Sequence, residues 1–202
     1  MNRREEFCQS YHPVVDSLVL PDRIALIYQP EACLAEHDGR SVWLLRRRCD
    51  GSPYILKLAR EEGEDLEEEF RLLTQLYPTL AGHVPLATDC FREGETVYLV
   101  RSYLPGESLT RHIEKMGPCK EETCRQMGLQ LAALVGQLHR QTPPIIHRDI
   151  KPDNIIVGPD GALGLIDFGI ARRYKPHREN DTKIMGSSVT AAPEQYGYSQ
   201  TD

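Results

Sequence analysis

The chain has 202 residues, 40% of them hydrophobic and 27% charged, and a globular chain of this length buries about 70% of its unfolded surface. Its 30 acidic and 24 basic residues give a formal charge of −6, and no stripe of Lys and Arg runs through aromatic residues, so nucleic acid is not an expected partner. The six cysteines include no C-x-x-C pair, which argues against a zinc site or a disulfide framework and favours a reducing, cytoplasmic compartment. The most apolar window, residues 129–138, is too short to span a bilayer.

The first hundred residues read mainly as strands, with one helix among them. Two β-rich runs flank Cys49-Asp50-Gly51-Ser52, and Asp-Gly is a hairpin signal, so Lys57 lies near the end of the second run. Residues 64–76 carry Leu66, Phe70, Leu73 and Leu76 at helical spacing, which predicts an amphipathic helix. The acidic residues at its beginning suit the positive end of the helix dipole. Residues 95–104 predict another strand.

After the break at Pro105-Gly106 the pattern becomes helical. Residues 107–117 predict a short helix, and residues 120–140 predict a longer one with a single apolar stripe formed by Met127, Leu131, Leu134, Val135 and Leu138. Two short strands, 154–157 and 163–167, follow on either side of a turn at residues 158–161.

Charged and polar residues gather in and after the stretch IIHRDIKPDNIIV, residues 145–157. Asp149 follows a β-type run, Asn154 stands at the mouth of the predicted hairpin, and Asp167 ends its second strand. A hairpin can bring Asn154 and Asp167 side by side as oxygen ligands suited to Mg²⁺. Phosphoryl transfer needs such ligands, a positioned base and cations near the phosphate oxygens.

Three ordered motifs carry a family resemblance: HRDIKPDN at 147–154, DFG at 167–169 and APE at 192–194. From about residue 24 to its last residue the chain resembles the eukaryotic-type Ser/Thr protein kinases, and the sequence around the DFG and APE motifs is most similar to that of the bacterial members. The resemblance implies an α+β, bilobal protein-kinase-like fold. We expect a β-rich N-lobe with one αC helix and a mainly helical C-lobe that is truncated after the APE region.

The resemblance also implies roles for individual residues. Asp149 would accept or orient the proton of the substrate hydroxyl, and Lys151 would hold the γ-phosphate of ATP. Asn154 and Asp167 would bind Mg²⁺. Lys57 would contact the α- and β-phosphates, with Glu69 as its ion-pair partner and Glu68 as the less favoured choice.

The adenine and regulatory positions follow from the same resemblance. Arg101 falls at the gatekeeper position, and backbone groups of Ser102 and Leu104 would hydrogen-bond the adenine base, with Ile156 beneath it in an apolar slot. Arg148 would pair with a phosphorylated residue of the activation segment. Thr182 is the first choice for autophosphorylation, and Ser187 would contact the catalytic loop.

Three readings of function follow. The first is an ATP- and Mg²⁺-dependent protein Ser/Thr kinase, or its catalytic fragment, acting on Ser/Thr hydroxyls of a protein substrate. The second is a pseudokinase or interaction module, motivated by three departures from the family. The glycine-rich loop is missing, since Gly39 is the only glycine between Ile24 and Val42, and Ile55 replaces a small residue above the adenine. The last of these departures is that the helices expected after the APE region are missing. The third is a small-molecule phosphotransferase on the same fold, against which Lys151 and the APE element argue.

The expected organisation divides the chain into four parts. Residues 1–23 form an N-terminal extension, 24–100 the N-lobe, 101–106 the hinge and 107–202 a partial C-lobe with the catalytic loop and the activation segment. Because the expected C-lobe stops early, the apolar stripe of 127–138 would lack cover, and such a patch either binds a partner or causes aggregation. Three alternatives stay open: an excised piece of a longer kinase, a truncated gene product, or a minimal form that a completing chain or partner covers. The sequence identifies neither the protein substrate nor the upstream signal.

Overall fold

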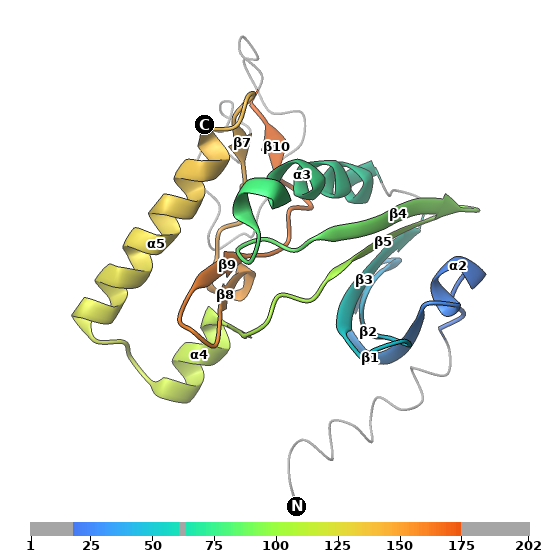
Figure 1. Cartoon of the computed structure of the whole chain (residues 1–202), viewed down its shortest axis with the longest axis horizontal. Helices are drawn as coiled ribbons and strands as arrows, with labels where there is room; N and C mark the ends of the chain where they lie inside the picture. Colours follow the sequence, from blue (N-terminus) through green and yellow to red (C-terminus); the bar gives the residue numbers. More distant parts are fainter. Residues whose placement is uncertain (1–17, 61–63, 175–202) are drawn as a thin grey trace, which may run out of the picture. The chain divides into compact units, whose positions relative to one another are not determined.

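The computed structural model describes residues 18–60 and 64–174, and these form the α+β fold that the sequence predicts (Figure 1). The described residues divide into two compact units. The first contains the described residues up to Phe70 together with 87–103, and the second contains 71–86 and those from Leu104 onward. Among the described residues, no helix is both long enough and apolar enough to cross a membrane.

An antiparallel sheet of five strands in the order β1-β2-β3-β5-β4 forms most of the first unit. Its strands are β1 (Tyr28–His37), β2 (Arg40–Arg47), β3 (Pro53–Arg60), β4 (Ala87–Glu93) and β5 (Thr96–Ser102). Two helices accompany it, α2 (Asp22–Ala25) and the start of α3 (Glu64–Leu80). The predicted strands around Lys57 and the predicted helix at residues 64–76 are therefore confirmed.

The predicted hairpin between β2 and β3 is present, and its turn is stabilised by Asp50. The Asp50 carboxylate accepts hydrogen bonds from the Ser52 backbone N–H at 3.0 Å and from the Arg47 guanidinium. These bonds hold the pKa of Asp50 well below its usual range. Gly51 takes a φ of 71°, a conformation that glycine adopts without strain.

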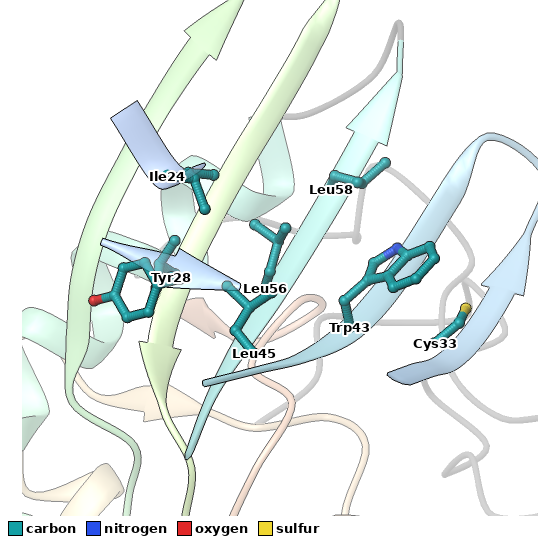
Figure 2. Packing of buried hydrophobic residues seen from close by; sticks show 8 residues of the cluster. Ile24, Tyr28, Cys33, Trp43, Leu45, Leu56 and Leu58 are labelled. Carbon is teal, nitrogen blue, oxygen red and sulfur yellow. The ribbon is translucent and has the colours of Figure 1, made fainter. Parts of the chain in front are cut away.

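Apolar side chains on one face of the five-stranded sheet form the core of the first unit (Figure 2). Trp43, Leu45, Leu56 and Leu58 come from β2 and β3, and Ile24 of α2 packs onto the same cluster with 1% of its surface exposed. The neighbouring Arg23 makes two hydrogen bonds to the Asp89 carboxylate, at 2.7 and 2.6 Å, and its guanidinium lies 4.7 Å from the centre of the Phe91 ring. Helix α2 is thus held to the sheet by burial and by an ion pair.

Among the described residues, the second unit combines the end of α3 and two further helices with two small sheets. Its elements are β6 (Glu107–Ser108), α4 (Leu109–Met116), α5 (Glu121–His139), β7 (Ile145–Ile146), the 3₁₀ turn η1 (Pro152–Asn154), β8 (Ile155–Val157), β9 (Leu163–Leu165) and β10 (Arg172–Arg173). One sheet has the order β6-β8-β9 and the other pairs β10 with β7. Both predicted helices and both predicted short strands are present.

The end of α3 and the loop after it cluster with the second unit, although the sequence placed the whole stretch 24–100 in one lobe. A pair of hydrogen bonds joins this loop to β9 in the same unit. Leu165 N–H donates to His83 O at 2.8 Å, and His83 Nδ1 donates to Leu163 O at 2.7 Å. The loop at His83 is therefore fixed to β9 by both backbone and side chain.

Candidate active site

Lys57 and Glu69 form the ion pair that the family resemblance predicted. Lys57 Nζ donates to both carboxylate oxygens of Glu69, at 2.9 and 2.7 Å. Glu69 is fully buried and Lys57 is 9% exposed. Glu69 shares a helical face with the buried Leu66, Leu73 and Leu76, which explains why it, and not Glu68, meets the lysine.

A two-residue turn, Asp38-Gly39, joins β1 to β2. Both residues have positive φ, 43° and 74°, as in the type I′ turns that fit the twist of an antiparallel pair. Arg40 follows the turn directly and forms an ion pair with Asp65 at the start of α3. This compact turn stands where the family resemblance would place a glycine-rich loop.

The predicted gatekeeper and adenine-binding residues come from three places: Arg101 and Ser102 lie on β5, Leu104 lies two residues after β5, and Ile156 lies on β8. Arg101 is 5% exposed and lies opposite Ile55 in the β3–β5 ladder, while Ser102 lies opposite Tyr54. In the second unit, Leu104 and Ile156 line one cavity of about 300 Å³ together with Gly164. The structure therefore brings Leu104 and Ile156 to a common apolar space.

Arg101 also takes part in the buried ion pair, which the sequence analysis did not predict. Its Nε lies 3.9 Å from Glu69 Oε1, the oxygen that also accepts from Lys57. The signal in the sequence is a charged residue inside an otherwise apolar strand, Thr96–Ser102. A buried arginine needs a partner, and that requirement alone predicts an acidic neighbour.

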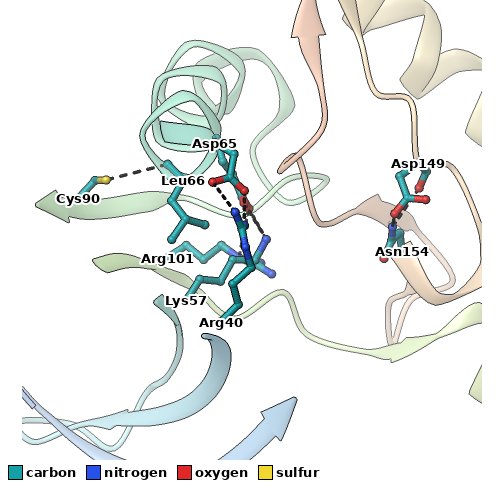
Figure 3. A network of polar contacts seen from close by, with 9 residues as sticks. Arg40, Lys57, Asp65, Leu66, Cys90, Arg101, Asp149 and Asn154 are labelled. Atoms are coloured by element: carbon teal, nitrogen blue, oxygen red, sulfur yellow. Dashed lines mark hydrogen bonds and ion pairs between the residues drawn. The ribbon is translucent and has the colours of Figure 1, made fainter. Parts of the chain in front are cut away.

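Asp149, Lys151 and Asn154 meet through one carboxylate oxygen in the second unit. Asp149 Oδ2 accepts a hydrogen bond from Asn154 Nδ2 at 2.8 Å and lies 2.8 Å from Lys151 Nζ. Asn154 Nδ2 also donates to the Asp149 backbone oxygen at 2.9 Å (Figure 3). The 3₁₀ turn η1 closes the loop through Asn154 N–H to Lys151 O at 2.9 Å. Asp149 is thus held in one orientation by two neighbours in its own loop.

Strands on both sides hold this loop in place. Ile145 and Ile146 of β7 pair with β10, and Ile155 of β8 pairs with Leu165 of β9. All three isoleucines are buried. His147 is also buried and lies edge-on against Phe168, with ring centres 4.6 Å apart. The charged segment is a loop anchored by apolar residues at each end.

The residues predicted to bind Mg²⁺ flank the β8–β9 hairpin, because Asn154 ends η1 directly before β8 and Asp167 lies two residues after β9. Ile166 N–H donates to Asn154 O at 3.0 Å, and Asp167 is the next residue, with a φ of 67°. The Asn154 amide nitrogen bonds to Asp149, so its Oδ1 is the atom able to act as a metal ligand. One amide oxygen and one carboxylate fit Mg²⁺, which keeps several waters and takes further oxygens from phosphates.

Arg148 lies directly before Asp149 with a φ of 68°, a conformation that is strained for a residue other than glycine. Burial lowers the pKa of its guanidinium from the ordinary value. Thr182 and Ser187, predicted as regulatory positions, and the APE element at 192–194 lie outside the described residues.

Comparison with known families gives one match over most of the chain. The model of the protein kinase domain matches residues 41–202. This range includes every residue that the sequence predicted for the site.

Individual relatives agree with this match. The chain is 32% identical over 164 residues to sperm motility kinase 2B of Mus musculus, covering 78% of this chain and 32% of that protein. It is 28% identical over 180 residues to a probable serine/threonine-protein kinase of Clostridium perfringens, covering 87% of this chain and 26% of that protein. It is 32% identical over 143 residues to serine/threonine-protein kinase 36 of Mus musculus, covering 70% of this chain and 10% of that protein. The chain spans about a third or less of the length of these relatives.

Proposed function

This chain belongs to the protein kinase family, and from that membership we propose that it transfers the γ-phosphate of Mg-ATP to a Ser or Thr hydroxyl of a protein. The observation that carries the proposal is the shared contact of Lys151 and Asn154 with Asp149 Oδ2, at 2.8 Å each. A carboxylate held in this way is a positioned base, which phosphoryl transfer to a hydroxyl requires.

Asp149 would accept the proton of the attacking hydroxyl or orient that hydroxyl in line with the γ-phosphate. Its side chain is only 11% exposed, so few waters compete with the substrate for its oxygens. Lys151 would use its ammonium group to neutralise the charge that develops on the transferred phosphate. Its side chain is 24% exposed, which leaves the ammonium accessible to a ligand.

The family resemblance assigns nucleotide contacts to residues in each unit. In the first, Lys57 would contact the α- and β-phosphates while Glu69 fixes its position. Ser102 and Leu104 would offer backbone groups to the adenine base, and Ile156 would give it an apolar contact. Asn154 and Asp167 would hold Mg²⁺, which when bound neutralises phosphate oxygens.

The choice of Ser/Thr over other acceptors rests on the family resemblance of Lys151 and on the names of the relatives. A role for Arg148 in binding a phosphorylated Thr182, with Ser187 contacting the catalytic loop, stays part of the proposal. The cytoplasmic compartment and a partner covering the apolar stripe of 127–138 also stay predictions.

Transfer of labelled phosphate tests the reaction. The full chain is incubated with labelled Mg-ATP alone and with a basic protein acceptor, and phosphoserine and phosphothreonine are then identified. We expect Asp149→Asn to abolish transfer and the exposed neighbour Asp153→Asn, in the same loop, to leave it within about twofold of the unchanged chain. Equal transfer by the Asp149→Asn variant would refute the assignment.

A second candidate function, a nucleotide-free interaction module, is favoured by two observations. The β1–β2 turn offers Gly39 as its single glycine, and Ile55 is buried on the sheet face that carries Lys57. A ligand that binds only the folded state raises its stability by RT ln(1+[L]/Kd). No thermal shift with millimolar Mg-ATP would therefore favour the interaction module over the kinase.

A further inference from the structure

Arg101 lies on the same face of the sheet as Lys57, and its side chain is 6% exposed. In the β3–β5 ladder Arg101 pairs with Ile55, and Lys57 follows Ile55 by two residues, so both cations project from the face that α3 covers (Figure 3). Burying a second cation beside the first is costly unless each has an anionic neighbour.

Glu69 is the anion that both cations share. Lys57 Nζ contacts both of its oxygens, and Arg101 Nε lies 3.9 Å from Oε1. All three residues are at least nine-tenths buried. At these distances, and with little water nearby, the electrostatic energy of each charged group depends on the other two.

We propose that Arg101 is a positioning residue for Lys57: it acts as a second counter-cation of Glu69 and holds this carboxylate in place. The guanidinium stays charged at any working pH, so the Glu69 carboxylate keeps a cationic neighbour even while the Lys57 ammonium contacts the phosphates of a nucleotide. The inference deepens the proposed function and rests on it for the nucleotide, but the coupling between Arg101 and Glu69 is testable without any ligand.

A thermal double-mutant cycle tests this coupling in the full chain. Arg101→Gln, Lys57→Met and their combination are melted while the fluorescence of Trp43 is followed, because this single tryptophan lies in the same unit. Each single variant leaves Glu69 with one of the two cations. The double variant leaves the buried Glu69 carboxylate with neither of them. We therefore expect Arg101→Gln to lower Tm at least about twice as much in the Lys57→Met background as in the unchanged chain.

Arg92 provides a matched control. It is an arginine on β4 that pairs with Glu67 of the same helix at 3.6 Å, but both side chains are more than a third exposed. Arg92→Gln should leave Tm nearly unchanged in either background, because surface ion pairs contribute little. Equal losses for Arg101→Gln in the two backgrounds would overturn the proposal.

Nucleotide binding gives the functional readout. We expect Arg101→Gln to weaken ADP about tenfold more than adenosine, which has no phosphates, whereas a general structural defect would weaken both equally. Arg101→Lys, which keeps the charge, should restore most of the ADP affinity. In the Lys57→Met background Arg101→Gln should have no further effect on ADP, because Arg101 acts through the lysine.

The outcomes separate the two proposals. Equal weakening of ADP and adenosine, or ADP losses that add independently of Lys57, would overturn the positioning role of Arg101 while leaving the kinase assignment intact. A full chain that binds no ADP would overturn the proposed function, and the thermal cycle would still decide whether Arg101 holds Glu69.

Discussion

Replacing Asn154 with Ala removes two hydrogen bonds from the loop that orients Asp149. One goes to the backbone oxygen at 2.9 Å and contributes about 1 kcal/mol, and the other goes to the carboxylate at 2.8 Å and contributes about 2 kcal/mol. Asn154 is 6% exposed, so little water can replace the lost donor. Because Lys151 still contacts the carboxylate, we expect a net loss of about 2 kcal/mol in the free energy of unfolding.

Urea unfolding followed by circular dichroism measures this loss, since α5 and Asn154 belong to the same unit. The neighbouring Asp153, which is exposed, serves as the control, and Asp153→Ala should stay within about 0.5 kcal/mol of the unchanged chain. If Asn154→Ala also lost less than about 0.5 kcal/mol, its bonds to Asp149 would not hold the loop, and the physical basis for a positioned base would fail.

Two further predictions concern packing and pH. A Cβ on Gly164 would lie 2.3 Å from Leu104 Cδ2, so Gly164→Ala should lower the free energy of unfolding in urea by about 1–3 kcal/mol. A Cβ on Gly128 in α5 would meet nothing within 4 Å, so Gly128→Ala should raise the free energy of unfolding by about 0.5–1 kcal/mol. The same sign for both variants would contradict the packing argument. The hydrogen bonds from Arg47 lower the pKa of Asp50, so the stability that this turn contributes is present above about pH 4 and is lost as the pH falls below it. Asp50→Asn should therefore flatten the acidic part of the curve of Tm against pH. An unchanged slope would show that the Asp50 carboxylate does not contribute to stability.

Local patterns predicted the elements well, because their causes lie within a few residues. The Asp50-Gly51 turn followed from dipeptide chemistry, and the 3.6-residue period predicted the helix at residues 64–76. The choice of Glu69 within that helix came from the family resemblance, and in the structure Glu69 meets Lys57. The family motifs likewise located Asp149 and Asn154, whose side chains the structure brings into contact.

Local patterns could not predict contacts between elements that are distant in the sequence. The pairing of Arg23 with Asp89 spans 66 positions, and strand β4 carries no strong alternation of its own. The ion pair of Arg101 with Glu69 depends on the register of β5 against β3, which only the folded sheet defines.

The apolar stripe predicted on α5 is only partly buried among the described residues. Leu134 and Leu138 are buried, whereas Met127 and Leu131 are half-buried. Helical period identifies which residues share a face, but the degree of burial depends on what packs there, and the sequence pattern contains no such information.

The small ladder between β7 and β10 has a mechanical consequence. Its two residue pairs, Ile146 with Arg172 and Ile145 with Arg173, join the segment that enters the catalytic loop to the segment that leaves the DFG motif. While both residue pairs are formed, the two segments are tied together over their whole paired length and move together. Any displacement of Arg172 and Arg173 is thereby transmitted along the backbone to the entrance of the loop that holds Asp149.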